Sequence, residues 1–525
     1  MQDLAPMPNS ERQERRHALH RLSRGTTLAL SALVGLLSGL TAVLFRLLVE
    51  ETESGRAWVC EFLWQRHGHL GMFALIAFSG ALGALAAWLT KRLCPEAGGS
   101  GIPHVKAVLI SARRIRAARL IATKLGAGLL ALASGMSLGR EGPTVHMGSA
   151  CGEGFARLFR LPGRTRRALI ASGAGAGLAA AFNAPLAGFL FIMEELRRDM
   201  SRATYGNALV TAVTSVGVTR LLLGSEPALR APDMKPLALT ALPAVILVGL
   251  LAAGVGRLFN VALLGSLDIK VSPWIKGLLV GCLGGVLALL LPHATGGGNV
   301  LIADLLSGHS EHDAVWLLLV LLGVKLSFTI ASYATGAPGG IFAPLLCIGS
   351  VLGYTTGLAL QYVMPDLTPG PERLATVGMA AVLTGSVRAP LTGVVLIVEM
   401  TGQYHTLYSL LLGAFISYAV SEGIKNEPIY EALLERDLKR NRQKLEGEPG
   451  LIEFQIEPGS AMDRARIGGL RVPEDFLIAV VERDGEVLVP HGSTRLQAGD
   501  YLTVVSGPRC QDGSLSDFLD SARAP

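Results

Sequence analysis

The chain has 525 residues, of which 50% are hydrophobic and only 17% are charged, and its formal net charge is +6. Because soluble domains carry about 25% charged residues, this composition excludes an ordinary soluble protein and predicts a membrane protein. The six cysteines are scattered and form no C-x-x-C pair, so neither a zinc site nor a disulfide framework is indicated.

Residues 1–25 are polar, and we expect them to lie in the cytoplasm. Positive charge before a first membrane span keeps that end of the chain inside, and the segment carries Arg12, Arg15, Arg16, Arg21 and Arg24. The same rule places the C-terminal side in the cytoplasm, where we find Lys439, Arg440, Arg442 and Lys444. A polar start does not predict a cleavable signal peptide. We therefore expect a multi-pass protein of the inner membrane whose net charge reflects these flanks rather than nucleic-acid binding.

Long apolar runs follow the polar start. Residues 26–45 and 72–90 hold no charge, and each run is close to the ~20 residues that a helix needs to cross a bilayer. Shorter or interrupted runs follow at 121–138, 168–193, 206–219, 237–256, 277–292, 314–332, 340–363, 374–398 and 406–420. This pattern predicts an all-α polytopic membrane domain over residues 26–430. Breaks at Gly or Pro predict helices that end inside the membrane, around a cavity lined by protein.

The sequence repeats itself at a fixed spacing. At an offset of 201 residues, several residues of the first half match the second: Lys124 with Lys325, Gly135 with Gly336, Gly139 with Gly340, and Pro143 with Pro344. At an offset of 205, "APLAGFLFIME" (184–194) matches "APLTGVVLIVE" (389–399). Matches in Gly and Pro mark backbone geometry rather than hydrophobicity. We predict two inverted-topology repeats with discontinuous helices, at about 70–225 and 273–421, and a substrate site between them.

"GREGP" (139–143) and "GIFAP" (340–344) are repeat partners, so they should face each other across that site. Each begins with Gly and ends with Pro, as a loop that leads into a helix does. The free N–H groups and positive dipole end of such a helix favour an anion. Glu141 can act there as a tethered anion that leaves on protonation or when a substrate anion competes. Alternatively, Arg140 and Glu141 lie in a polar loop outside the bilayer.

A second Gly-rich loop, "GGSGIPHVK" (98–106), has "TGGGNVLI" (295–302) as its weaker repeat partner. Ser100 offers a hydroxyl donor flanked by glycines, which suits an unhydrated anion. An ordinary turn with a solvated serine is the alternative.

Glu194 and Glu195 end a long apolar run. Adjacent helical residues point about 100° apart, so the two need not share a role. A carboxylate at the cytoplasmic mouth can pass protons inward, or it is a solvated helix end paired with Arg197 or Arg198. Tyr430, just past the last span, is either an interfacial anchor or a hydroxyl that reaches the ion.

An ATP-binding motif is absent from the sequence. No phosphate-binding G-K-[ST] follows a Gly-rich loop. His104 and His146 are isolated histidines, which metal sites rarely use. We therefore expect no enzymatic activity, no cofactor and no metal.

"GSGIP" (99–103), "GREGP" (139–143) and "GIFAP" (340–344), in this order and spacing, resemble the CLC chloride channel and transporter family. "FNAPLAG" (182–188) and Tyr430 also fit, and the resemblance covers roughly residues 26–435. It implies that the hydroxyls of Ser100 and Tyr430 and the backbone amides of Ile341 and Phe342 bind chloride. The supporting residues are Gly99, Gly101, Pro103, Lys124, Gly139, Arg140, Gly142, Pro143, Gly340 and Pro344.

The resemblance also implies the roles of two acids. Glu141 is similar to the gating glutamate, which alternates between blocking the anion path and carrying the proton, and Glu195 to the internal proton-transfer glutamate. An acid at 195 resembles the exchanger branch, and serine at 100 resembles the chloride-selecting form. Members of the family are homodimers with one pathway per subunit, which we expect here.

Composition changes after Tyr430. Residues 431–449 are charged and predict a linker helix. Residues 450–507 instead contain short segments of alternating apolar and polar residues, separated by turn residues. "FLIAVVERDGEVLVP" (476–490) predicts a hairpin with Asp-Gly at its turn, and "LQAGDYLTVV" (496–505) adds a strand. This small cytosolic β-rich domain resembles the TrkA-C domain of bacterial cation transport proteins, which implies a regulatory role and a small-molecule ligand. A dimerisation cap without a ligand is the alternative, and 508–525 form a tail.

Taken together, the sequence predicts a chloride–proton antiporter. A passive chloride channel is the alternative within transport, and it differs in moving no coupled protons. A membrane ion sensor that signals through the C-terminal domain is an alternative of another class.

Overall fold

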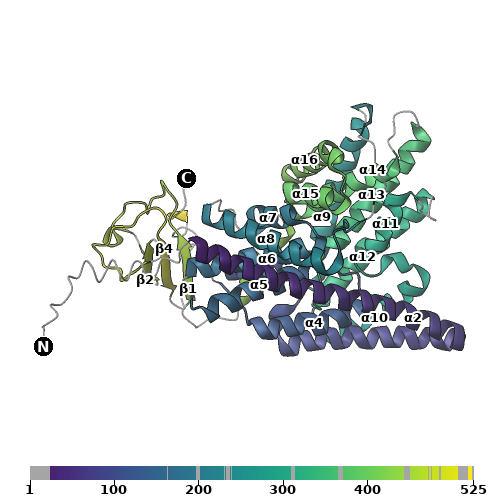
Figure 1. Cartoon of the computed structure of the whole chain (residues 1–525), viewed down its shortest axis with the longest axis horizontal. Coiled ribbons are helices and arrows are strands. Elements are labelled where there is room, and N and C mark those ends of the chain that lie inside the picture. Colours follow the sequence, from purple (N-terminus) through teal and green to yellow (C-terminus); the bar gives the residue numbers. More distant parts are fainter. Residues whose placement is uncertain are drawn as a thin grey trace.

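The computed structural model describes residues 24–522 except for 111, 162, 197–201, 230, 232–236, 238, 309–313, 365–369, 443–449, 471, 474–475, 484–485, 507–517 and 519. Most of the described chain is helical, and a small sheet follows the last helix. Figure 1 shows the sheet at one end of the long axis of the helical bundle.

The first half of the helical domain begins with α2 (Arg24–Leu93), two helices joined at Gly68, whose φ of 50° and ψ of −125° are not helical. The elements that follow are η1 (Pro95–Ala97), α3 (Ile102–Leu109), α4 (Ala117–Ala133), α5 (Glu141–Leu158), α6 (Gly163–Phe182), α7 (Pro185–Phe191), the π-helical η2 (Ile192–Leu196) and α8 (Arg202–Leu223).

The second half repeats this order of long and short helices. Its elements are η3 (Leu239–Ala241), α9 (Leu242–Ser266), α10 (Pro273–Leu290), η4 (Pro292–Ala294), α11 (Asn299–Ser307), α12 (Val315–Ala334), α13 (Phe342–Val363), α14 (Pro371–Val387), α15 (Pro390–Thr401), η6 (Tyr404–Thr406), α16 (Leu407–Gly423) and α17 (Ile429–Arg442).

Seven helical segments of the described chain are long and apolar enough to cross a membrane, and two of them make up α2. Their burial differs widely: 89% of the apolar window of α13 is buried inside the protein, against 22% of that of α10. Other helices are too short to cross alone, since α3, α7 and α11 have 8, 7 and 9 residues. The predicted multi-pass fold with discontinuous helices is confirmed.

Corresponding glycines make corresponding contacts in the two halves. A Cβ on Gly148 of α5 would lie 2.1 Å from the carbonyl oxygen of Gly173 on α6. In the second half, a Cβ on Gly349 of α13 would lie 2.4 Å from the carbonyl oxygen of Gly378 on α14. Small residues let membrane helices approach closely. The duplication predicted from sequence is therefore a duplication of helix packing.

This packing predicts a stability difference between two glycine variants. Gly349→Ala is expected to lower the apparent melting temperature of the detergent-solubilised protein, because overpacking of a tight contact costs about 1–3 kcal/mol. Gly254→Ala is the matched control, since Gly254 is exposed on α9 and nothing lies within 4 Å of the position of its Cβ. Equal melting temperatures for the two variants would contradict the close packing of α13 and α14.

Two glutamates join the halves by capping each other's helices. Glu194 of η2 accepts hydrogen bonds from the backbone N–H groups of Leu391 (3.1 Å) and Thr392 (2.7 Å), at the start of α15. Glu399 of α15 accepts from those of Leu186 (3.1 Å) and Ala187 (2.9 Å), at the start of α7. A carboxylate at a helix N-terminus is favourable. The alternative of a solvated helix end at Glu194 is therefore wrong.

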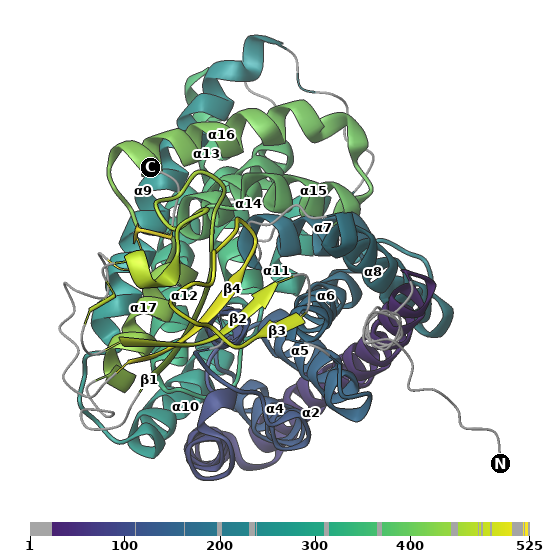
Figure 2. The same cartoon turned by 90° about the vertical axis from the view of Figure 1, so that its left-hand side faces the viewer.

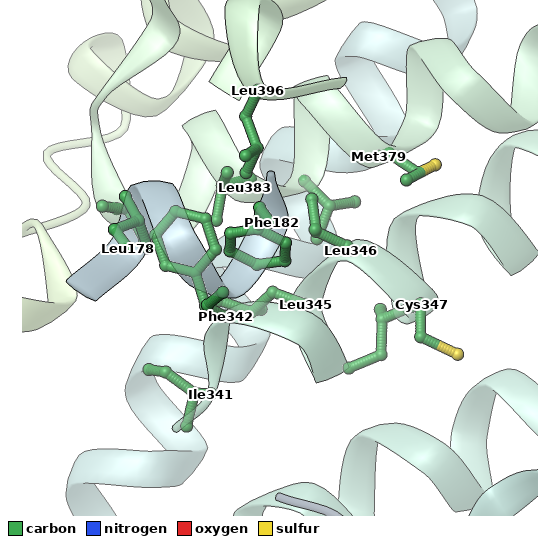
Figure 3. Packing of buried hydrophobic residues seen from close by; sticks show 14 of the residues in the cluster. Leu178, Phe182, Ile341, Phe342, Leu345, Leu346, Cys347, Met379, Leu383 and Leu396 are labelled. Carbon is green, nitrogen blue, oxygen red and sulfur yellow. The ribbon is translucent and has the colours of Figure 1, made fainter. Parts of the chain in front are cut away.

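Phe342, the first residue of α13, anchors the core beneath the loops. Its ring lies 5.9 Å from that of Phe182 and 6.4 Å from that of Phe191, measured between ring centroids. Figure 3 shows Phe182 and Phe342 among Leu178, Leu345 and Leu383. Because this side chain is held in apolar packing, the start of α13 is fixed in place.

The C-terminal domain is a four-stranded antiparallel sheet, which agrees with the β-rich domain predicted from sequence. Its strands are β1 (Gly450–Gln455), β2 (Phe476–Arg483), β3 (Glu486–Leu488) and β4 (Tyr501–Ser506), in the order β1-β4-β2-β3. Figure 2 looks onto this end of the molecule. The β2–β3 hairpin is confirmed, and its predicted Asp-Gly turn lies outside the described residues. A 3-10 turn, η7 (Ile467–Gly469), packs in the β1–β2 connection.

Two sequence boundaries near the C-terminus need correction. The ring of Phe518, placed in a tail by sequence, packs 5.4 Å from that of Phe476, and both residues belong to the core of the sheet domain. The linker helix begins at Ile429 rather than at residue 431, so Tyr430 lies in its first turn. Both differences arise because burial, not local composition, decides where these segments pack.

Candidate anion site and proton path

The three Gly-rich loops predicted to form the site meet in the structure. The backbones of Gly139 and Gly340 exchange two hydrogen bonds, of 2.7 and 2.8 Å. Gly99 donates to the carbonyl oxygen of Ala337 (3.1 Å) and accepts from the N–H of Gly339 (3.1 Å). The predicted approach of "GREGP" to "GIFAP" is confirmed, and the "GSGIP" loop joins them.

Gly142 lies at the point of closest approach between these loops. A Cβ there would be 2.8 Å from the Cα of Gly340 and 2.9 Å from the Cα of Ser100. Gly101 has φ 86°, the left-handed conformation that favours glycine, and caps the start of α3. The N-termini of α3, α5 and α13 therefore converge on one buried region. Their first N–H groups lack partners within their helices, which makes the region favourable for an anion.

Two buried hydroxyl groups, those of Ser100 and Tyr430, lie near this region. Tyr430 is fully buried, and among the described residues its hydroxyl finds no hydrogen-bond partner. Ser100 is also fully buried, and its hydroxyl accepts a long contact of 3.4 Å from the N–H of Ile102 and interacts with Tyr333. A buried donor without a partner is costly. Both hydroxyls fit donation to an anion, whereas the alternative of a solvated turn at Ser100 is wrong.

Ile341 and Phe342 begin α13 and are buried, with exposures of 0% and 1%. Ile341 is the N-cap, and its carbonyl oxygen already accepts the first helical hydrogen bond from Leu345. The amides of Ile341 and Phe342 are thus among those that a helix leaves for an outside partner. Pro344 and its repeat partner Pro143 follow in the same first turns, where a missing N–H does no harm.

Glu141 is the first residue of α5 and is 1% exposed. Its carboxylate folds back over its own loop, because a Cβ on Gly139 would lie 2.1 Å from Oε2. In the described part of the chain, Oε2 has no hydrogen-bond partner, although the carboxylate interacts with the backbone N–H of Ala343 at the start of α13. A solvated polar loop is therefore excluded for Glu141.

The two cations singled out by sequence have different places. Lys124 is fully buried and donates to the carbonyl oxygen of Gly99 at 2.7 Å, so it fixes the loop that carries Ser100. Its repeat partner Lys325 donates to three loop carbonyls, among them that of Gly296 at 2.8 Å. Arg140 instead reaches Glu50 of α2 at 3.4 Å. Lys124 supports the site through its loop, whereas Arg140 ties it to a neighbouring helix.

Glu195 lies on η2, with a side chain that is 6% exposed. It accepts a hydrogen bond of 2.8 Å from Nζ of Lys106, on α3. Tyr430 lies within electrostatic range of both Glu195 and Glu141. The predicted proton residue is therefore buried and next to the anion region. The alternative partners, Arg197 and Arg198, lie outside the described residues.

Several residues of this region were not predicted from the sequence. Tyr333 of α12 contacts Ser100, and a Cβ on Gly99 would lie 2.9 Å from its hydroxyl. Lys106 ends "GIPHVK" (101–106), and Glu431 follows Tyr430 in "IYEALL" (429–434). The sequence marks them only as charged residues among apolar ones. Among the described residues no group of three or more metal-ligating side chains occurs.

A family model described as voltage gated chloride channel matches residues 82–422, more than half of the chain. The chain belongs to the CLC family. The H(+)/Cl(-) exchange transporter ClcA of Vibrio vulnificus is 39% identical to this CLC protein over 448 residues, which are 82% of the chain and 94% of the relative. ClcA of Yersinia pestis is 34% identical over 463 residues, 84% of the chain and 95% of the relative.

Solved structures agree with this assignment. A slow cyanobacterial Cl−/H+ antiporter matches with a TM-score of 0.75 and 32% identity, over 80% of this CLC protein and 99% of that chain. A eukaryotic CLC transporter matches with a TM-score of 0.66 over 78% and 73% of the two chains, but at 23% identity it shows the fold alone. A second family model, the TrkA-C domain, matches residues 451–509, the region of the sheet.

Proposed function

We propose that this CLC protein exchanges chloride for protons across the cytoplasmic membrane, with both termini in the cytoplasm. The carrying observation is the buried Glu141 carboxylate at the junction of three helix N-termini, within electrostatic range of the unpartnered hydroxyl of Tyr430. The names of the ClcA relatives and of the cyanobacterial antiporter support the same activity. From the family resemblance we also propose a homodimer.

In the proposed cycle, the ionised Glu141 carboxylate occupies an anion position. Protonation removes its charge, and chloride then binds to the hydroxyls of Ser100 and Tyr430 and to the amides of Ile341 and Phe342. Helix N-termini stabilise either anion, because they supply positive potential without a mobile cation. Glu195 relays the proton between the site and the cytoplasm. The only chemical step in this cycle is the movement of a proton between oxygen atoms.

The test is proton movement in liposomes that hold the purified protein. A chloride gradient is applied, the voltage is clamped at zero, and external pH is followed. Protons driven against their own gradient support exchange. Chloride flux without proton movement would instead support a passive channel.

The C-terminal domain is proposed to be regulatory, with a small-molecule ligand. Its connection to the site is α17, which carries Tyr430 in its first turn. Three ion pairs fasten this helix: Arg113 with Asp437 at 2.9 Å, Arg436 with Asp268 at 2.7 Å and Lys106 with Glu431 at 2.8 Å. The hydrogen bond and the charge of Arg436 hold the pKa of Asp268 below its usual value. The guanidinium of Arg167, on α6, also lies 4.8 Å from the ring centroid of Tyr501.

Deletion of residues 449–525 is expected to leave coupled flux in place. The reason is that the described site residues all precede the deletion, and the last of them is on α17. Initial chloride and proton rates in liposomes are the measurement, with the full chain as control. Complete loss of flux in a folded, monodisperse truncation would favour the sensor alternative.

A further inference from the structure

Lys106 joins two carboxylates from distant parts of the chain. Its Nζ donates to Glu195 of η2 and to Glu431 of α17, both at 2.8 Å. Lys106 is in the last turn of α3, where a cation is favourable. The helix that begins beside Ser100 therefore ends at a three-residue cluster, Lys106–Glu195–Glu431.

The cluster is graded in exposure. The side chain of Glu431 is 33% exposed, whereas those of Glu195 and Lys106 are 6% and 8% exposed. Glu431 directly follows Tyr430, and Tyr430 lies within electrostatic range of Glu195, so the cluster lies near the proposed anion site. Glu431 is thus the member of the cluster that faces solvent, and Glu195 is the buried member.

Charge and distance fit the transfer of one proton. Two carboxylates and one ammonium leave a net charge of −1, which one proton neutralises. Because both carboxylates contact the same Nζ, their bonded oxygens are no further apart than the sum of two 2.8 Å contacts. A single water spans such a gap.

We propose that Glu431 is the proton-entry residue for Glu195 and that Lys106 is the positioning residue that holds the two carboxylates together. This inference rests on the proposed exchange function. A solvent proton binds a carboxylate oxygen of Glu431. The O–H bond on Glu431 then breaks as an O–H bond forms on Glu195, while the ammonium of Lys106 keeps its three protons and pairs with the carboxylate left behind.

The decisive variant is Glu431→Gln, which keeps the shape of the side chain but accepts no proton. Its proton flux is expected to fall by about 10²-fold, the lower end of the range for losing a proton-transfer group, with chloride flux within about twofold of wild type. Glu435→Gln is the matched control, because Glu435 lies one helical turn further on α17 with a side chain that is 62% exposed. Glu435→Gln should keep the wild-type ratio of chloride to protons.

A second variant tests the positioning role. Lys106→Met removes the bridging charge, and it should also lower proton flux more than chloride flux. A residue that only stabilises the fold would lower both fluxes together. Size-exclusion chromatography and the remaining chloride flux show whether the variant is folded, and if it is not, Glu431→Gln alone decides.

The outcomes separate this inference from the proposed function. A wild-type coupling ratio in Glu431→Gln, together with lost coupling in Glu195→Gln, overturns the entry role and leaves the exchange function standing. A wild-type chain that moves no protons overturns the exchange function itself. Lost proton flux in Glu431→Gln with a normal Glu435→Gln supports the inference.

Discussion

Glu141→Gln is expected to abolish proton movement while chloride continues to flow. Glutamine keeps the size of the side chain but neither ionises nor carries a proton, so it mimics the protonated state permanently. Loss of a proton-transfer group costs about 10²–10⁴-fold in rate, and here proton flux should fall below detection. The measurement is simultaneous recording of chloride and proton flux from liposomes.

The control for Glu141→Gln is Glu422→Gln. Glu422 is also a glutamate, but its side chain is 70% exposed and pairs with Arg388. Glu422→Gln should therefore leave the ratio of chloride to protons unchanged. If Glu141→Gln still moved protons against their gradient, the role of Glu141 as proton carrier would be wrong, whatever its place at the helix N-termini.

Glu195→Gln is expected to uncouple the two fluxes in the same way, and its neighbour is the sharpest control. Glu194 and Glu195 are adjacent, yet Glu194 caps α15 while Glu195 contacts Lys106 at 2.8 Å. Glu195→Gln should lower proton flux by about 10²–10⁴-fold, as expected for Glu141→Gln. Glu194→Gln should keep coupling and lower thermal stability, since loss of a capping side chain costs about 0.5–2 kcal/mol.

Coupling ratios and melting temperatures of both variants should be measured side by side. The reverse pattern, with coupling lost in Glu194→Gln and kept in Glu195→Gln, would contradict the assignment. It would mean that the carboxylate at the α15 N-terminus carries the proton. Loss of chloride flux in both would show only that η2 must be intact.

Much of this arrangement followed from the repeat. Gly139 and Gly340 were predicted to face each other because they match in the duplication, and their backbones do exchange two hydrogen bonds. Glycine and proline positions report backbone geometry directly. A loop that must approach another backbone closely therefore leaves a mark in the sequence that apolar residues do not.

The partners of charged side chains left no such mark. Lys106 is separated from Glu195 by 89 positions and from Glu431 by 325. No local pattern reports a contact between such distant residues, because it exists only after α3, η2 and α17 have packed. For the same reason the capping role of Glu194 was not separable from a solvated helix end, and Phe518 was assigned to a tail.

The sequence by itself determined the membrane-spanning fold, the internal duplication, and the loops that meet at the anion region. These features are carried by composition and by glycine and proline at fixed spacing, which act locally on the backbone. Only the tertiary structure decided that Glu194 caps a helix, that Glu195 is buried near the site, and that Lys106 pairs with Glu195. Those roles depend on desolvation and on contacts between distant segments, and both arise only when the helices are packed together.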